Sequence, residues 1–392
     1  MKTSLKRGLT LFLSLILVLS SAVTVAAAPS VKAISERETA PFEVDAVSAV
    51  LMDVRTGEIL FAQNPDQALP PASVTKVMTL LLVMEAIKEG KIAWSDTVTA
   101  SERATSMGGS QIYLEVGEQM SVEDLVKSVV IASANDAALA LAEHLAGSEE
   151  AFVKKMNDRA KELGMRNTHF ENTNGLDDTT VNHMTSARDI AIMSRELLGH
   201  EEILRFTKTW QDTIRQGEFT LTNTNRLVRF YPGATGLKTG STSKAKFCIS
   251  ASAERDGMHL VAVIMASPTR DIRNEAAKKL LDYGFANYAS YHEEGSSLGS
   301  LSVRGGVRDL CGISSREISL LVDKADVKNI VKKISLNEYL SAPVLKGEVV
   351  GEIGYYVGER KIGSAQIVAD EAVGKIGFSD FFLRMLRNFF VA

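Results

Sequence analysis

The chain has 392 residues, of which 45% are hydrophobic and 23% are charged, and its net charge is −4 at pH 7. This length permits two domains and a sizeable core, and the composition excludes a largely disordered or membrane-embedded chain. The weakly negative charge offers no basic footprint, so nucleic acid is not an expected partner.

Residues 1–28 have the composition of a secretory signal peptide. A basic start precedes an apolar run over residues 9–19, and small residues follow at 26–28. We expect cleavage after Ala27 or near Ala33, with an uncleaved membrane anchor as the alternative. The segment contains no cysteine, which excludes a lipoprotein anchor. The pattern therefore predicts a secreted protein that works outside the cytoplasm.

The next elements predict a mixed α/β domain over residues 34–288. Residues 46–64 read as a β-hairpin, and helical patterns dominate from 73 to about 198. Strands return over 235–267, and a helix follows over 271–289. Strands at both ends with helices between them predict one sheet built from both ends. The expected fold class is therefore α/β (α+β), with an antiparallel sheet and a helical cluster.

The composition changes at residues 290–306, which are rich in glycine and serine and are predicted to be a linker. Beyond this stretch come short alternating segments separated by turn signals. They predict a small all-β domain over residues 300–372.

The last segment, residues 376–392, is predicted to form an amphipathic helix. Its fifteen residues from Phe378 would span about 22 Å, too little for a hydrocarbon core of about 30 Å. We therefore expect a helix that lies on the outer face of the cell membrane and makes the protein a peripheral membrane protein. Packing of the apolar face on the β domain is the alternative. That face comprises Phe378, Phe381, Phe382, Met385, Leu386, Phe389 and Phe390.

Ser73 and Lys76 form an S-x-x-K motif where an apolar helix begins. A spacing of three places both side chains on one helix face, and the helix N-terminus adds positive potential and free N–H groups. A lysine desolvated among apolar neighbours has a lowered pKa, so its neutral amine can take the serine proton. We expect Ser73 to be a nucleophile and Lys76 its general base. Alone, the motif also fits a helix cap and a surface lysine.

Two further motifs carry polar groups suited to the same chemistry. The hydroxyl of Ser133 could relay a proton, and the amide of Asn135 could hold a substrate carbonyl. Lys238 and Thr239 could bind a terminal carboxylate, and Gly240 would let an extended peptide approach an edge strand. Each motif alone also fits a cap or a turn. The three in this order indicate a serine acyl-transfer site.

With these motifs, the chain resembles the penicillin-recognising serine enzymes. Within them it is similar to the low-molecular-mass D-alanyl-D-alanine carboxypeptidases of peptidoglycan maturation. The similarity is carried by LPPASVTKVMT, ASANDAA, HFENTNGLDDTTVNHMTSARDIA and YPGATGLKTGSTSKAKFCISASAERDGM. NTNRLVRFYPGATGLKTG is especially like the sporulation-associated members. The second domain and the terminal helix also resemble that family.

The resemblance implies a β-lactamase/transpeptidase-like catalytic domain that uses no cofactor or metal. Ser73 would attack the penultimate D-alanine of a peptidoglycan stem pentapeptide, with an oxyanion hole from the backbone N–H groups of Ser73 and Ser241. The terminal D-alanine would leave protonated through Ser133, and water would hydrolyse the acyl-enzyme. β-Lactam antibiotics would acylate Ser73. Ser241 and Ser243 stand where relatives often carry a bulkier residue, which leaves substrate preference open.

Two other functions share parts of this pattern. A class A β-lactamase needs a deacylating glutamate in an E-x-x-L-N context, which the chain lacks. A non-catalytic β-lactam or muropeptide sensor is usually fused to transmembrane helices, and no such segment follows residue 28. The histidines show no metal spacing, and His169 and His183 are expected to be structural residues near the site. Cys248 and Cys311 are expected to be free thiols.

Overall fold

The structure is a computed structural model that describes residues 42–390, except for the side chains of residues 387–390. The predicted signal peptide at 1–28 and its cleavage site lie outside the described residues, and both stay predictions.

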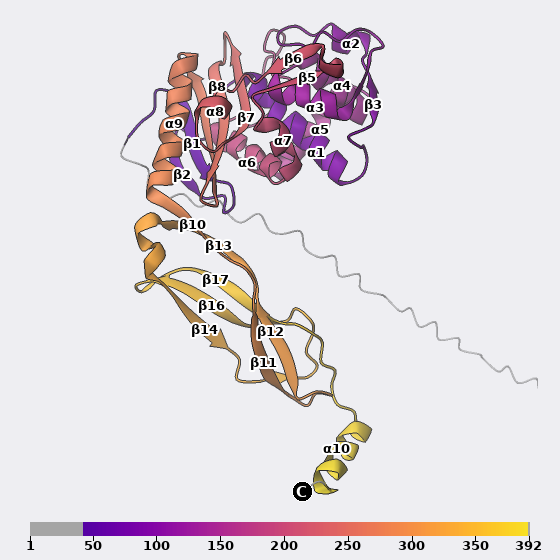
Figure 1. Cartoon of the computed structure of the whole chain (residues 1–392), viewed down its shortest axis with the longest axis vertical. Coiled ribbons are helices and arrows are strands. Elements are labelled where there is room, and N and C mark those ends of the chain that lie inside the picture. The colour runs from indigo at the N-terminus through magenta and orange to yellow at the C-terminus, as the bar shows by residue number, and fades with distance from the viewer. Residues whose placement is uncertain (1–41, 391–392) are drawn as a thin grey trace, which may run out of the picture. The chain divides into compact units, whose positions relative to one another are not determined.

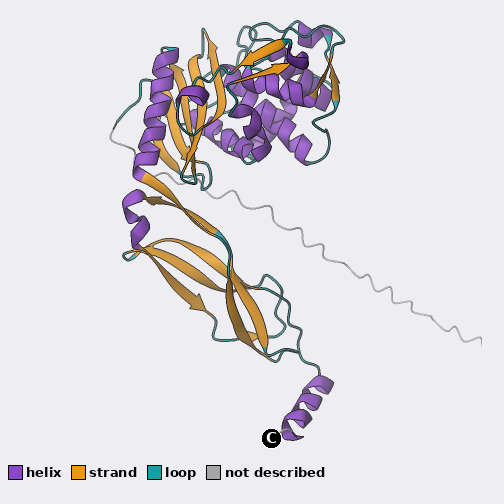
Figure 2. Ribbon diagram, viewed as in Figure 1, coloured by secondary structure: helices purple, strands orange, loops and turns teal. Residues whose placement is uncertain are grey.

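A five-stranded antiparallel sheet forms the centre of the larger domain (Figures 1 and 2). Leu51 pairs with Phe61 on one side and with Ala262 on the other, so the first strand joins a hairpin to the strands that follow the helices. The prediction of one sheet built from both ends is confirmed. In spatial order the strands are β2 (Ile59–Gln63), β1 (Ser48–Asp53), β9 (Met258–Ser267), β8 (Lys246–Arg255) and β7 (Ala234–Thr242).

Both faces of this sheet are covered. Val50 and Met52 of β1 belong to the core on the side of the helical cluster, whereas Ala49 and Leu51 belong to the core under α9 (Arg270–Asn287). The strands are therefore apolar on both faces, as expected when a sheet lies between two layers. Figure 2 shows α9 on one face and the helical cluster on the other.

The helical cluster begins with a 3₁₀ turn, Ala72–Thr75, which leads into α1 (Lys76–Lys88). The predicted apolar helix is confirmed, and nine of its thirteen residues are buried. The other helices are α2 (Glu102–Thr105), α3 (Val122–Ile131), α4 (Asn135–Ala146), α5 (Glu149–Glu162), α6 (Ala187–Leu198), α7 (Leu204–Thr207) and α8 (Leu227–Phe230). Two small two-stranded sheets lie among them, β3 (Thr97–Thr99) with β4 (Gln119–Ser121), and β5 (Gln211–Ile214) with β6 (Phe219–Thr222).

The prediction of a linker at residues 290–306 is wrong. β10 (Tyr288–Glu293) pairs with β13 (Ile318–Asp323), and β11 (Ser297–Arg304) pairs with its neighbour β12 (Leu310–Ser315). Strand pairing uses backbone groups, so a strand that keeps only a few apolar side chains on the core does not need an apolar composition. The remaining strands are β14 (Ile330–Leu336), β15 (Leu340–Ser341), β16 (Val349–Val357) and β17 (Arg360–Ala369). Together with β11 and β12, these four strands form a six-stranded sheet in the order β14-β16-β17-β12-β11-β15. The predicted all-β character is therefore confirmed.

The chain then forms α10 (Phe378–Phe390), which confirms the predicted amphipathic helix. Its polar side is tied to the β domain, because Arg384 donates to the carboxylate of Asp309 at 2.6 Å. Phe378 and Phe381 on the apolar face are 85% and 55% exposed. The alternative of that face packing on the β domain is therefore not what the structure has. Among the described residues, no helix combines the length and apolarity needed to cross a membrane.

Candidate active site

The S-x-x-K motif lies where the 3₁₀ turn meets α1. The Nζ of Lys76 lies 2.9 Å from the Oγ of Ser73 and 2.9 Å from the backbone carbonyl oxygen of Asn174. Ser73 is half-buried and lines a cavity, whereas Lys76 is fully buried. The predicted contact between the two side chains is therefore present.

The surroundings of Lys76 favour its neutral form. Burial lowers its pKa well below the ordinary value, and the positive charge of Lys238 lowers it further. The negative charge of Asp136 acts in the opposite direction. Because Lys76 has no carboxylate within salt-bridge distance among the described residues, desolvation dominates.

The second motif lies just before α4. Ser133 is nearly buried, lines the cavity and has a left-handed backbone with φ of +63°. Asn135 donates from its Nδ2 to the carbonyl oxygen of Gly108 at 2.6 Å, and its buried Oδ1 has no partner among the described residues. One of the two N–H groups of the amide that the sequence assigned to a substrate carbonyl is thus occupied here, and the atom without a partner among the described residues is an acceptor.

Sequence reasoning missed Asp136, the residue after this motif. Its buried carboxylate accepts hydrogen bonds from the backbone N–H groups of Ile112, Leu114 and Ala137, at 2.9–3.2 Å. This arrangement holds the loop that carries Ser110 over the cavity. A buried acid beside the motif was the available signal, but its partners are far away in sequence.

The third motif lies on β7, the predicted edge strand. Lys238 is buried and donates to the backbone oxygen of Thr239 at 2.9 Å, and its pKa is lowered to about 7 by burial and by the charge of Arg273. The hydroxyl of Thr239 donates to that of Thr224 at 2.8 Å. Thr239 lines the cavity and Lys238 does not. The two residues therefore differ in their access to a ligand.

Gly240 and Ser241 bring β7 next to Ser73. A Cβ on Gly240 would lie 2.8 Å from both the carbonyl oxygen of Pro71 and the backbone nitrogen of Ser73. Only glycine allows the strand to come this close, so Gly240 serves the approach of the strand to the Ser73 turn. Ser241 follows it at the cavity wall and is exposed.

The loop over residues 171–177 closes the site from the other side. Gly175 has a φ of +85°, and a Cβ there would lie 1.9 Å from the carbonyl oxygen of Ala72. Asn172 shapes the loop by accepting from the N–H of Gly175 at 2.7 Å. The carbonyl of Asn174 thereby reaches Lys76. The Asn-Gly composition signals a turn, but the target of that carbonyl is set by the fold.

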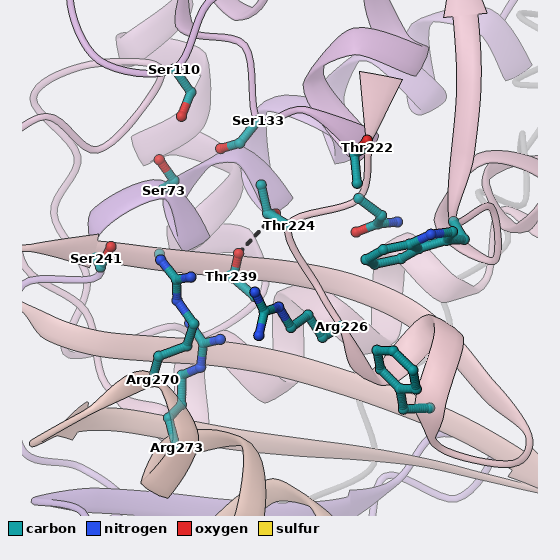
Figure 3. A pocket seen from close by; sticks show the side chains of 14 residues that line it. Ser73, Ser110, Ser133, Thr222, Thr224, Arg226, Thr239, Ser241, Arg270 and Arg273 are labelled. Atoms are coloured by element: carbon teal, nitrogen blue, oxygen red, sulfur yellow. Dashed lines mark hydrogen bonds between the residues drawn. The ribbon is translucent and has the colours of Figure 1, made fainter. Parts of the chain in front are cut away.

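Three arginines line the same cavity of about 580 Å³, and the sequence analysis did not single them out. Figure 3 shows Arg226, Arg270 and Arg273 on the side of Thr239, facing Ser73 and its neighbouring serines. Arg273 is buried, whereas Arg226 and Arg270 are exposed and have no carboxylate partner in the described part of the chain. The cavity therefore joins a hydroxyl-rich wall to a cationic one.

Comparison with known proteins agrees with this geometry. The family model described as D-alanyl-D-alanine carboxypeptidase matches residues 34–269, and that of the penicillin-binding protein 5 C-terminal domain matches residues 287–375. The chain belongs to the D-alanyl-D-alanine carboxypeptidase family. It is 42% identical over 359 residues to the D-alanyl-D-alanine carboxypeptidase DacF of Bacillus subtilis, covering 90% of this chain and 92% of that protein.

Solved structures give the same result for the fold. Penicillin-binding protein 5 from Haemophilus influenzae is 34% identical with a TM-score of 0.75, covering 86% of this chain and 100% of that chain. Penicillin-binding protein D2 from Listeria monocytogenes, in its ampicillin-bound form, is 32% identical with a TM-score of 0.58. It covers 63% of this chain and 100% of that chain. The chain is thus a serine hydrolase of the carboxypeptidase family, and the expected fold class is confirmed.

The predicted free thiols and structural histidines differ in their burial. Cys248 and Cys311 are both buried free thiols, as predicted. His183 is buried against the turn before Ser73, with its Nε2 2.8 Å from the hydroxyl of Thr75, whereas His169 is exposed. The two histidines that the sequence treated alike are therefore placed very differently.

Proposed function

We propose that this carboxypeptidase removes the terminal D-alanine from peptidoglycan stem pentapeptides through an acyl-enzyme on Ser73. The observation that carries the proposal is the 2.9 Å contact between the Oγ of Ser73 and the Nζ of a fully buried Lys76. A neutral amine has two N–H groups and one lone pair. One N–H is taken by the carbonyl of Asn174, which leaves the lone pair for the proton of Ser73.

Each step of the reaction then has a residue to serve it. Lys76 takes the proton as Ser73 Oγ bonds to the carbonyl carbon of the penultimate D-alanine. The backbone N–H groups of Ser73 and Ser241 would stabilise the oxyanion, because Gly240 lets β7 lie against the Ser73 nitrogen. The C–N bond breaks, and the leaving amine of D-alanine receives its proton through Ser133. Water then cleaves the ester and restores the Ser73 hydroxyl.

The cationic wall suits the terminal carboxylate of this substrate. Thr239 offers a hydroxyl at the cavity, and Arg226 and Arg270 offer guanidinium groups that have no carboxylate partner among the described residues. Lys238 supports the carboxylate through its charge rather than by direct contact, since it does not line the cavity. β-Lactams present a carboxylate and a strained acyl group, so we expect them to acylate Ser73 as well.

Labelled penicillin and a D-Ala-D-Ala peptide test this proposal. Ser73→Ala should abolish both covalent labelling and D-alanine release, while the wild type should release D-alanine in large excess over protein. Labelling of the alanine variant would refute the role of Ser73. Stoichiometric labelling without D-alanine release would indicate the sensor function, and rapid turnover of penicillin would indicate a β-lactamase.

We further propose that the protein is secreted across the cytoplasmic membrane and is held on the outer face of that membrane by α10. The similarity to penicillin-binding protein 5 and to a D-alanyl-D-alanine carboxypeptidase supports an extracytoplasmic site of action. The exposed phenylalanines of α10 form an apolar face without a partner among the described residues. A helix with such a face partitions into the boundary between lipid head groups and acyl chains.

Binding to liposomes of anionic and zwitterionic lipids tests the role of α10. Replacing Phe381 and Phe382 by serine should lower liposome binding at least about tenfold, because burying each side chain contributes about 1.5–3 kcal/mol. The matched control is Leu345→Ser, which removes an apolar residue of the β domain that is 68% exposed, against 55% for Phe381 and 46% for Phe382. Equal binding by all three proteins would refute this anchor. The similarity to sporulation-associated members remains part of the proposal and is not tested by this experiment.

A further inference from the structure

The 3₁₀ turn Ala72–Thr75, which contains Ser73, is held by a short series of hydrogen bonds. Ala72 has a left-handed backbone with φ of +49°, directly before Ser73. A non-glycine residue in this region is strained and needs support from its surroundings. The hydroxyl of Thr75 donates to the carbonyl oxygen of Ala72 at 2.9 Å. The same hydroxyl lies 2.8 Å from the Nε2 of His183.

The tautomer of His183 follows from its two contacts. Its Nδ1 accepts from the backbone N–H of Glu171 at 3.0 Å, so this nitrogen carries no hydrogen. The hydrogen therefore sits on Nε2 and is donated to the hydroxyl of Thr75, whose own hydrogen points to Ala72. Every donor in this series has one acceptor. The charged form of His183 would set two hydrogens against each other at Nδ1.

The groups around the imidazole agree with a neutral ring. Burial lowers the pKa of His183 to about 4, and the charge of His169 acts in the same direction. The negative charges of Glu171 and Asp177 oppose this shift. Phe170 packs edge-on against the ring at 5.7 Å between centroids, so the imidazole is fixed in place as well as in protonation state.

These hydrogen bonds hold the 3₁₀ turn against the loop over residues 171–177, which also contacts Lys76. Gly175 packs so closely on the turn that a Cβ would meet the Ala72 carbonyl at 1.9 Å and the Thr75 hydroxyl at 2.8 Å. The neighbouring carbonyl of Asn174 accepts from Lys76. A change at the turn would thus move both the nucleophile and the contact that fixes its base.

We infer that His183 is a positioning residue for acylation. Through the hydroxyl of Thr75 it holds Ala72, the residue directly before Ser73, in its left-handed conformation. The inference rests on the proposed role of Ser73 as nucleophile. The neutral imidazole does not exchange a proton with substrate. It keeps the Ser73 backbone N–H beside β7 and the Ser73 hydroxyl beside Lys76, and errors of about 1 Å in such geometry cost on the order of a hundredfold in rate.

The test compares penicillin acylation by the full-length protein and four variants. Thr75→Val removes the hydroxyl and keeps the shape, and His183→Phe removes both ring nitrogens. Each should lower the acylation rate constant at least about tenfold and leave the non-covalent dissociation constant within about threefold. The double variant should be no slower than the slower single variant, because both changes break one series of hydrogen bonds. Thr75→Ser, which keeps the hydroxyl, should stay within about threefold of the wild type.

Several outcomes would overturn the inference. His169→Phe is the matched control, because this exposed histidine should leave acylation unchanged. A His183→Phe protein that melts earlier but acylates at the wild-type rate would show a merely structural role. Rate losses that multiply in the double variant would separate the two residues. If His183→Phe does not fold, the contrast between Thr75→Val and Thr75→Ser decides, and equal rates for these two would refute the role of this series.

The two proposals fail in different ways. Labelling of the Ser73→Ala variant would show that Ser73 is not the nucleophile and would refute the proposed function. An unlabelled Ser73→Ala together with unchanged acylation by Thr75→Val and His183→Phe would refute only the positioning role.

Discussion

Lys76 and Lys238 are both buried, yet only Lys76 contacts Ser73. The pKa of Lys238 is lowered to about 7, so near neutrality it carries its charge only part of the time. Its repulsion of a charged Lys76 is therefore partial, and burial is the main cause of the lowered pKa of Lys76. Desolvation therefore contributes most to the lowered pKa of the proposed base.

Replacing Lys76 by arginine should lower acylation by orders of magnitude while the fold is kept. Arginine retains the positive charge but does not deprotonate at accessible pH, so it cannot take the Ser73 proton. Stopped-flow acylation with a chromogenic penicillin measures the rate, and circular dichroism checks the fold. A near-wild-type rate would show that Lys76 acts only through its charge.

The pH dependence of acylation should follow the neutral form of Lys76. Because the pKa of Lys76 is lowered, its amine is neutral above that pKa, so acylation should be maintained at neutral pH and fall as the solution becomes acidic. The acylation rate constant between pH 5 and 9 gives this profile. Acylation that rises with acidification would contradict a lysine base.

Arg226 should contribute to the capture of the substrate carboxylate. Arg226→Gln should raise KM for a D-Ala-D-Ala peptide about tenfold with little change in kcat, since a charge-assisted hydrogen bond contributes about 1.5–3 kcal/mol and solvent screens part of it. Arg229→Gln is the matched control. It removes an equal charge from α8, but Arg229 stacks over Trp210 and Phe230 instead of lining the cavity. Equal effects of the two changes would indicate long-range attraction only.

At the scale of elements, the site is made where three segments meet within van der Waals contact. The 3₁₀ turn at Ala72–Thr75 is squeezed between β7 and the loop over residues 171–177. Gly240 permits the first approach and Gly175 the second. The two glycines therefore determine how closely the nucleophile is enclosed.

Gly175→Ala should be far more damaging than Gly90→Ala. Both glycines have positive φ, +85° and +70°, so both variants lose about 1–2 kcal/mol to backbone strain. A Cβ at Gly90 meets nothing within 4 Å, whereas at Gly175 it meets the Ala72 carbonyl. This clash should cost a further ~1–3 kcal/mol and reduce acylation. Chemical denaturation measures the free energy of unfolding of both variants. Equal losses would show that the loop over residues 171–177 shifts without moving the 3₁₀ turn.

On β9, His259 should make the fold sensitive to acid. Its Nε2 lies 2.9 Å from the Thr235 hydroxyl, and burial lowers its pKa from 6.5 to about 4. Between these values the unfolded chain binds more protons than the folded one, so the free energy of unfolding rises with pH there and falls on acidification. His259→Gln should flatten the dependence between about pH 6.5 and 4. An unchanged slope would assign the acid sensitivity elsewhere.

At the scale of the whole molecule, hydrolysis and membrane binding are assigned to separate parts of the chain. Ser73, Lys76 and the cavity belong to the region matched by the carboxypeptidase family model, whereas α10 follows the second matched region. Arg384 of α10 bonds to Asp309 of the β domain, and the described phenylalanines of α10 are exposed.

Deleting residues 376–392 should therefore release the protein from membranes and leave its activity on soluble peptides intact. Sedimentation with liposomes measures the first, and D-alanine release measures the second. Equal liposome binding by the truncated and complete proteins would exclude α10 as the anchor. Loss of soluble activity on truncation would show that α10 also supports the site.

Most of the candidate site could be predicted from the sequence, because its chemistry is carried by short local motifs. Ser73 and Lys76 are three residues apart, and Lys238, Thr239 and Gly240 are consecutive, so local geometry relates them. The strands at 290–306 could not be predicted, since pairing by backbone groups leaves little trace in composition.

The sequence by itself determined the hairpin, the apolar helix α1, the three motifs and the amphipathic end of the chain, because periodicity and spacing act over a few residues. Only the tertiary structure decided what surrounds Ser73 and Lys76. The carbonyl of Asn174 lies 98 residues from Lys76 along the chain, and the imidazole of His183 lies 108 residues from Thr75. Burial, and with it the lowered pKa of Lys76, is a property of all the segments packed around it, which no local pattern contains.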